Sequence, residues 1–292
     1  MKIALIGPGA VGGSVAAWVA QGEGVELVLC VRTPFDRLVV EHPAGSLELE
    51  PRLVTDPAEA EIADWVLIAT KAYDSASAAP WLERLVGPAT RVAVLQNGVE
   101  HLARFAPCLP ADRIVPAIVD IPAERNEPGR IRQRRNGTII VPAGRNGEDF
   151  VRLFDASPIE ASTSEDWLSA AWAKLCLNSA GAVSALTLKP AGISQREPIA
   201  SIMRALVEEC AAVGRAEGAE LPDDIAERVI GHYRASPPDS GNSLHADRIA
   251  GRPMEVDARN GVIVRLGRRH GIDTPANAMV TALLEASASE IS

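Results

Sequence analysis

The length, composition and charge of the chain limit the classes of protein to which it can belong. Its 292 residues are enough for about two domains, and its 47% content of hydrophobic residues supports a sizeable core. The formal net charge of −9 argues against a nucleic acid or an anionic membrane as partner, because the overall field would repel both.

Cysteine usage and the N-terminus both indicate a cytoplasmic protein. The four cysteines lie far apart without a C-x-x-C pair, which fits neither a zinc site nor a disulfide framework: Cys30, Cys108, Cys176 and Cys210. Lys2 and the apolar residues after it resemble a signal peptide, but Pro8 and several glycines interrupt the run. Trp18 also stands where a small residue should precede a cleavage site. We therefore expect reduced cysteines, no metal and no membrane partner.

The first residues of the chain have the order strand, glycine turn, helix. Ile3 to Ile6 is a continuous apolar run, typical of a parallel strand covered on both faces, and Ser14 to Gln21 has a helical pattern. Between them, three glycines match G-x-G-x-x-G, which permits a tight turn, a close approach of pyrophosphate and close packing of helix on strand. The N–H groups that open the helix would then face the phosphates. Dinucleotide contacts are predicted at Gly7, Pro8, Gly9, Ala10, Val11 and Gly12.

The end of the next strand predicts the type of dinucleotide. Val25 to Val31 is a second apolar run, and the position twenty residues after Gly12 is Arg32. At about this distance, NAD-binding folds place an acidic residue on the ribose hydroxyls, whereas NADP-binding folds place an arginine on the 2′-phosphate. Arg32 therefore predicts NADP(H). The alternative is that Arg32 is merely solvated and that Asp36 meets the ribose.

Polar residues follow two further predicted strands. Lys71 follows the apolar run Trp65 to Thr70, and Asn97 lies just beyond Arg91 to Leu95. In an open α/β sheet the ligand lies beyond the carboxyl ends of the strands, so four residues should converge there: Gly7, Arg32, Lys71 and Asn97. Taken singly, Lys71 is also an ordinary exposed lysine and Asn97-Gly98 a common turn dipeptide.

From residue 114 the pattern indicates antiparallel strands. Three runs read as strands: Ile114 to Ile121, Gly129 to Arg134 and Thr138 to Val141. Asn136-Gly137 between the last two predicts a hairpin, so antiparallel strands should complete the sheet. Four arginines in this region should lie on an exposed edge strand, where charge discourages pairing with another chain: Arg130, Arg132, Arg134 and Arg135.

The remaining chain is predicted to be helical. A helix should start near residue 165 and continue through an apolar segment that contains Lys174 and Asn178, which are four residues apart and share one face. Polar groups in so apolar a helix need polar partners, unless Lys174 extends to the surface. Ser243 and Glu255 each open a later helix and could face a cleft.

We therefore predict an α/β fold with two domains. Residues 1–163 should form a Rossmann-like dinucleotide-binding domain, and residues 164–292 an all-helical domain that carries the substrate-binding and catalytic residues.

Six motifs in register resemble those of the ketopantoate reductase (2-dehydropantoate 2-reductase) family over essentially the whole chain. Besides the N-terminal glycine turn with Arg32, they are T-K-A at 70–72, Q-N-G at 96–98, W-x-K-L-x-x-N at 172–178, S-L-x-x-D at 243–247 and E-V-D-x-x-N-G at 255–261. The resemblance implies that NADPH reduces ketopantoate to pantoate, a precursor of pantothenate and coenzyme A. It also allows for a homodimer.

The resemblance also implies roles for individual residues. Lys174 matches the catalytic lysine, which donates a proton to the carbonyl oxygen, and Asn178, Ser243 and Glu255 match residues that hold the substrate's hydroxyl and carboxylate. Arg32, Lys71 and Asn97 match cofactor contacts, and Asn97, being near the nicotinamide, is also counted as substrate-binding.

One departure concerns the exact substrate. The family often has a second asparagine one helical turn after Asn178, where this chain has Ala182, so that hydrogen bond is missing or comes from elsewhere, for instance from Ser179 or Ser184. The alternatives are an NADP-dependent reductase of another 2-keto acid or of an imine, and a non-catalytic NADP(H)-sensing protein. The retained Lys174 argues against the sensor.

Overall fold

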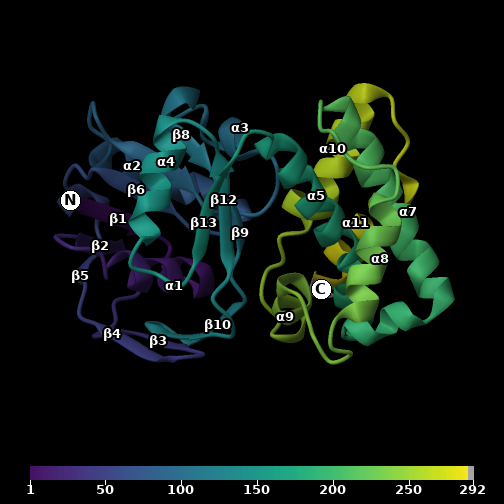
Figure 1. Cartoon of the computed structure of the whole chain (residues 1–292), viewed down its shortest axis with the longest axis horizontal. Coiled ribbons are helices and arrows are strands. Elements are labelled where there is room, and N and C mark those ends of the chain that lie inside the picture. The colour runs from purple at the N-terminus through teal and green to yellow at the C-terminus, as the bar shows by residue number, and fades with distance from the viewer. Residues whose placement is uncertain (289–292) are drawn as a thin grey trace. The chain divides into compact units, whose positions relative to one another are not determined.

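The computed structural model describes residues 1–288 and divides the chain into two compact units (Figure 1). The first runs from Met1 to Trp167 and contains all the strands found in residues 1–288, whereas the second begins at Leu168 and is helical over its described residues. The prediction of an α/β fold with a Rossmann-like N-terminal part and a helical C-terminal part is confirmed.

The first unit is built on a six-stranded parallel sheet of order β5-β2-β1-β6-β7-β8. Its strands are β1 (Lys2–Ile6), β2 (Glu26–Cys30), β5 (Arg52–Val54), β6 (Trp65–Ile68), β7 (Arg91–Val94) and β8 (Ile114–Pro116). Alternate residues of β1 belong to different apolar clusters: Ile3 and Leu5 to one, Ala4 and Ile6 to the other. Because both faces of the sheet are covered, the strands are continuous apolar runs rather than alternating ones.

One face of this sheet is covered by α1 (Ala10–Val19), which also packs on a second sheet of order β10-β11-β3-β4. That sheet contains β3 (Leu38–His42), β4 (Gly45–Leu49), β10 (Ala123–Glu127) and β11 (Arg130–Gln133). The contact is close at Gly13, where a Cβ would lie 2.0 Å from the Cδ1 of Ile131. The sequence did not reveal the β3–β4 hairpin, because its alternation is short and lies in a segment rich in proline and acidic residues.

The predicted hairpin at Asn136-Gly137 is wrong. β11 is already paired on both edges, with β10 and with β3, so β12 (Thr138–Pro142) has no free edge of β11 to join. Instead, β12 pairs with β9 (Ile118–Asp120) and β13 (Glu160–Ser164) in a third sheet. Asn136-Gly137 therefore connects two sheets, and the large parallel sheet ends at β8 without antiparallel strands.

The position predicted for the basic cluster is also wrong. β11 is an inner strand, so Arg130 and Arg132 do not mark an edge. The charges are instead balanced by exposed ion pairs, for example Arg130 with Glu127 at 2.8 Å and Arg135 with Asp120 at 2.6 Å. Exposed pairs of this kind contribute about 0 to 1 kcal/mol each to stability.

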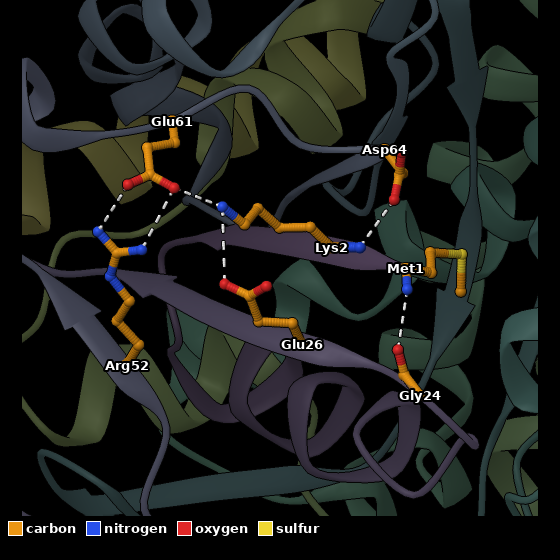
Figure 2. A network of polar contacts seen from close by, with 7 residues as sticks. All are labelled: Met1, Lys2, Gly24, Glu26, Arg52, Glu61 and Asp64. Carbon is orange, nitrogen blue, oxygen red and sulfur yellow. Dashed lines mark hydrogen bonds and ion pairs between the residues drawn. The ribbon is translucent and has the colours of Figure 1, made fainter.

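Charged residues form ion pairs at the amino-terminal ends of the strands of the parallel sheet (Figure 2). The Lys2 ammonium lies 2.5 Å from the Glu61 carboxylate, which also binds Arg52, and 3.6 Å from Glu26. The hydrogen bond from Lys2, with a further one from Arg52, lowers the pKa of Glu61 to about 2. The glycine turn lies at the opposite ends of the strands, their carboxyl ends.

The second unit consists of helices and two short helical turns of other types. Its α-helices are α5 (Trp167–Ala180, whose first residue belongs to the first unit), α6 (Ala182–Thr187), α7 (Glu197–Ala216), α8 (Ile225–Ala235), α9 (Ser243–Ile249), α10 (Val262–His270) and α11 (Pro275–Ala288). A π-helical turn, η6 (Asp257–Gly261), leads directly into α10. Among residues 1–288 no helix combines the length and apolarity required to span a membrane.

Candidate active site

The glycine turn between β1 and α1 has the geometry that its spacing predicts. Gly7 has φ +83°, and a Cβ there would lie 2.9 Å from Thr70. A Cβ at Gly12 would lie 2.5 Å from the Gly7 carbonyl oxygen and 2.7 Å from the Ala69 Cβ, so strand and helix pack too closely there for a side chain. Gly9 is different, since the nearest atom to its Cβ position is 4.0 Å away. The turn is tight at its first and third glycines and open at its second.

The opening at Gly9 fits a pyrophosphate. Gly9 is the N-cap of α1, so Ala10, Val11 and Gly12 form the first helical turn, where N–H groups lack intrahelical partners. These three residues are uncharged, so no carboxylate competes with an anion for the positive end of the helix dipole. Pro8 and Gly9 bring the chain into this position.

The structure brings the other predicted cofactor residues to the same edge of the sheet. Ile6, Cys30, Ile68 and Val94 end adjacent parallel strands in register. Gly7 and Arg32 follow the first two of these residues, and Lys71 and Asn97 follow the others. Lys71 and Asn97 are both partly buried.

Gln96, to which the sequence assigned no role, joins the loops after β6 and β7. Its side chain is buried, and its Nε2 donates to the Thr70 Oγ1 at 3.0 Å while its Oε1 accepts from Ser75 at 3.1 Å. The Arg104 guanidinium donates to the Asn97 carbonyl oxygen at 2.9 Å. These bonds fix the loop that carries Asn97 against the loop that carries Lys71.

A buried histidine supports the same loop. His101 is 1% exposed, and its Nε2 lies 2.8 Å from the Gln96 carbonyl oxygen. Burial lowers the pKa of His101 to about 4. The imidazole is therefore neutral near pH 7 and donates its Nε2 proton to that carbonyl.

Arg32 lies at the surface and is paired with an acidic residue. Its side chain is 86% exposed, and its Nη1 lies 3.3 Å from the Asp74 carboxylate. Asp74 belongs to the 3-10 segment η2 (Ala72–Ala78), which follows Lys71. The cation expected to bind a 2′-phosphate thus already has a carboxylate beside it.

In the second unit, Lys174 and Asn178 lie one turn apart on α5 and are both partly buried. The end of this helix is held by three side chains from other segments. The Tyr233 hydroxyl donates to the Leu177 carbonyl oxygen at 2.9 Å, Asn242 donates to that of Gly181 at 2.9 Å, and Arg259 donates to that of Asn178 at 2.6 Å. The carbonyl groups at a helix C-terminus lack intrahelical donors, and these side chains supply them.

The same contacts bring Ser243 to this end of α5. Asn242 also caps α9, since its Oδ1 accepts from the His245 N–H at 3.1 Å, and this places Ser243 at the start of α9. Arg259 lies 3.5 Å from the Ser243 hydroxyl oxygen. Burial lowers the pKa of Arg259, and the charge of Glu255, which is itself only 4% exposed, partly opposes this lowering. Arg259 thus links Asn178 and Ser243 by hydrogen bonds. We refer to the four candidate residues of the second unit, together with Arg259, as the α5 cluster: Lys174, Asn178, Ser243 and Glu255.

Comparison with known proteins identifies the family of the chain. The family model described as ketopantoate reductase PanE/ApbA matches residues 3–146, and the model of its C-terminal part matches residues 166–288. The chain belongs to the ketopantoate reductase family. It is 60% identical to a 2-dehydropantoate 2-reductase of Caulobacter vibrioides over 98% of this chain and 99% of the relative.

Solved structures of the family have the same fold. A ketopantoate reductase of Ralstonia eutropha JMP134 superimposes with a TM-score of 0.88 at 33% identity, covering 99% of this chain and 98% of the other. A structure of D-mandelate dehydrogenase with NADH and anilino(oxo)acetate superimposes with a TM-score of 0.88 at 22% identity, over 99% and 98% of the chains, which shows a shared fold. This member of the ketopantoate reductase family is an oxidoreductase with a dinucleotide-binding fold.

The two serines that could stand in for a second asparagine are both buried, and one of them is engaged in a hydrogen bond. The Ser179 hydroxyl donates to the Cys176 carbonyl oxygen at 2.9 Å and is fully buried, and Ser184 is also buried. The cluster does contain another polar side chain, Arg259, which the sequence did not single out because it occupies an unspecified position of E-V-D-x-x-N-G.

Proposed function

We propose that the protein catalyses the NADPH-dependent reduction of 2-dehydropantoate to pantoate, in the cytoplasmic synthesis of pantothenate and coenzyme A. The observation that carries this proposal is the 60% identity with a 2-dehydropantoate 2-reductase along nearly the whole of both chains. The glycine turn and the α5 cluster support it, because they supply the groups that the reaction needs.

The first unit would hold the cofactor. The first-turn N–H groups of α1 would bind the pyrophosphate at Gly9, and Arg32 would bind the 2′-phosphate that distinguishes NADPH from NADH. Lys71 and Asn97 would bind the cofactor from the ends of β6 and β7. NADPH, when bound, supplies the hydride.

The α5 cluster would hold the 2-keto acid and supply the proton. Negative charge develops on the ketone oxygen as its carbon is reduced, and an ammonium at that oxygen both stabilises the charge and donates the proton, an effect worth roughly 10² to 10⁴ in rate. Lys174 is the residue proposed for this step. Asn178 and Ser243 would donate to the carboxylate or hydroxyl of the substrate, and the Glu255 carboxylate would accept from the hydroxyl.

A second candidate substrate is another 2-keto acid, and Ala182 is the observation that favours considering it. An alanine cannot make the hydrogen bond of the asparagine that the family often has there, so the selectivity for the hydroxylated, branched ketopantoate could be relaxed.

The oxidation of NADPH by the purified protein, followed at 340 nm, tests the proposal. Ketopantoate, pyruvate, 2-oxobutyrate and 2-oxoisovalerate are compared by kcat/KM, with NADPH and with NADH. Ketopantoate with NADPH should give the highest value. A higher value for one of the other acids would replace the substrate, and no turnover of any acid would favour the cofactor-sensing alternative.

A further inference from the structure

The α5 cluster contains a buried cation that has no role in the proposed reaction. Arg259 is 2% exposed and is the one arginine or lysine buried within residues 1–288. Taking a guanidinium out of water costs several kcal/mol, so a buried one requires partners that repay this cost. Within residues 1–288, its two hydrogen bonds go to the candidate substrate-binding residues Asn178 and Ser243.

The first bond positions Asn178. The Arg259 Nη2 donates to the Asn178 backbone oxygen at 2.6 Å, near the end of the helix that also carries Lys174. The guanidinium is also close to Gly181, where a Cβ would lie 3.2 Å from Nη2. Gly181 immediately precedes Ala182, so the cation lies next to the turn of chain where the family often has its second asparagine.

The second bond orients Ser243. A guanidinium can only donate, so the Ser243 hydroxyl oxygen accepts from Arg259, at 3.5 Å. The hydroxyl proton of Ser243 is then available to an acceptor on its other side. Burial lowers the pKa of Arg259, and the negative charges of two acidic residues, Glu255 and Asp247, oppose this lowering.

The backbone around Arg259 is irregular. The residue lies in the π-helical turn η6, between Glu255 and α10, and such turns are rare and frequently found at functional sites. The Arg259 Nε is buried and has no hydrogen-bond partner within residues 1–288. A buried donor of a charged group that remains unpaired is costly unless it serves a ligand or a network.

We propose that Arg259 is a positioning residue that gives the site its preference for a carboxylate. It holds the Asn178 backbone and the Ser243 hydroxyl in place and adds a positive charge next to them, which compensates for the amide that Ala182 lacks. This inference rests on the proposed function, and the ligand class it names is the carboxylate of a 2-keto acid rather than the ketone itself.

The experiment compares an acid with its neutral counterpart. We would measure kcat and KM for ketopantoate and for its primary amide in the wild type, Arg259→Gln, Arg259→Met and Arg259→Lys. Two neutral variants are included so that one that fails to fold leaves the other. Tyr233→Phe is the matched control, because Tyr233 donates to the same end of α5 without a bond to a candidate substrate residue.

The neutral variants should lose about tenfold to a hundredfold in kcat/KM for the acid, mainly through KM, and much less for the amide. Arg259→Lys, which keeps the charge but not the planar fork, should restore part of the preference. Tyr233→Phe should affect the acid and the amide equally. The affinity for NADPH, measured by fluorescence titration without substrate, should stay within about twofold in all variants because Arg259 lies in the other unit.

Equal losses for acid and amide in the neutral variants, as in Tyr233→Phe, would show that Arg259 only caps the helix and would overturn the inference. Such a result would leave the proposed function intact, since the wild type would still reduce the acid. If the wild type reduced no 2-keto acid, the proposed function itself would fail.

Discussion

The two candidate functional regions of this oxidoreductase are built from different parts of the chain. The glycine turn in the first unit is a feature of the backbone, set by where a Cβ can and cannot fit over six consecutive residues. The α5 cluster in the second unit is a feature of side chains, assembled from residues 174 to 259 by hydrogen bonds to the end of one helix. Substitutions in the glycine turn should therefore impair binding through a steric clash. Substitutions in the α5 cluster should instead impair it by removing a particular charge or hydrogen-bond donor.

The largest effect is expected from the proposed general acid. Lys174→Ala should lower kcat about a hundredfold or more, because no ammonium would then stabilise the developing oxyanion or protonate it. The affinity for NADPH should be nearly unchanged. Lys189→Ala, the same substitution at an exposed position of the second unit, is the control and should retain wild-type kcat. Full activity of Lys174→Ala would assign the acid to another residue.

Cofactor selectivity should depend on Arg32. Arg32→Ala should weaken NADPH binding by roughly 1.5 to 3 kcal/mol, the range for hydrogen bonds to charged groups, and spare NADH. Isothermal titration with each cofactor measures this directly. Arg37→Ala removes another exposed arginine from the same region and should alter neither affinity. If Arg32→Ala weakened both cofactors equally, Arg32 would have a structural role instead.

A substitution in the glycine turn should not discriminate between NADPH and NADH. A methyl group at Gly12 would meet the Gly7 carbonyl oxygen and the Ala69 Cβ, and main-chain neighbours cannot move aside cheaply. Overpacking of this kind typically costs about 1 to 3 kcal/mol. Gly12→Ala should therefore weaken the binding of NADPH and NADH alike and lower the melting temperature of the protein. Gly24→Ala is the control, because a Cβ there meets no neighbour and the substitution tests the effect of a strained φ alone. A loss confined to NADPH would contradict the steric explanation.

The same contrast explains how far the sequence could be interpreted. The spacing of Gly7, Gly9 and Gly12 predicts the turn because each position has a separate steric requirement. The α5 cluster has no such spacing: Lys174 and Asn178 are recognisable from helical periodicity, but the contribution of Arg259 depends on a π turn and on a partner 81 residues away. The local sequence after residue 114 does not predict which strands pair, for a related reason. The local signal at Asn136-Gly137 favours a hairpin, yet both edges of β11 are occupied by strands from elsewhere in the chain.

The smallest expected effect concerns the carboxylate beside Arg32. Asp74 lies 3.3 Å from the guanidinium, and a 2′-phosphate bound there would be attracted by the arginine and repelled by the aspartate. Because Arg32 is exposed and Asp74 only partly buried, removing the negative charge should change the free energy of binding by no more than about 1 kcal/mol. Asp74→Asn should accordingly tighten NADPH by up to about fivefold and leave NADH equal or weaker, since a ribose hydroxyl loses an acceptor. Asp36→Asn, a charge-matched change four residues from Arg32, should change neither affinity, whereas weaker binding of both cofactors would favour the alternative in which Asp36 meets the ribose. Weaker binding of NADPH by Asp74→Asn would mean that the carboxylate holds Arg32 in its binding orientation, so that the selectivity for the phosphate would require both residues rather than the arginine alone.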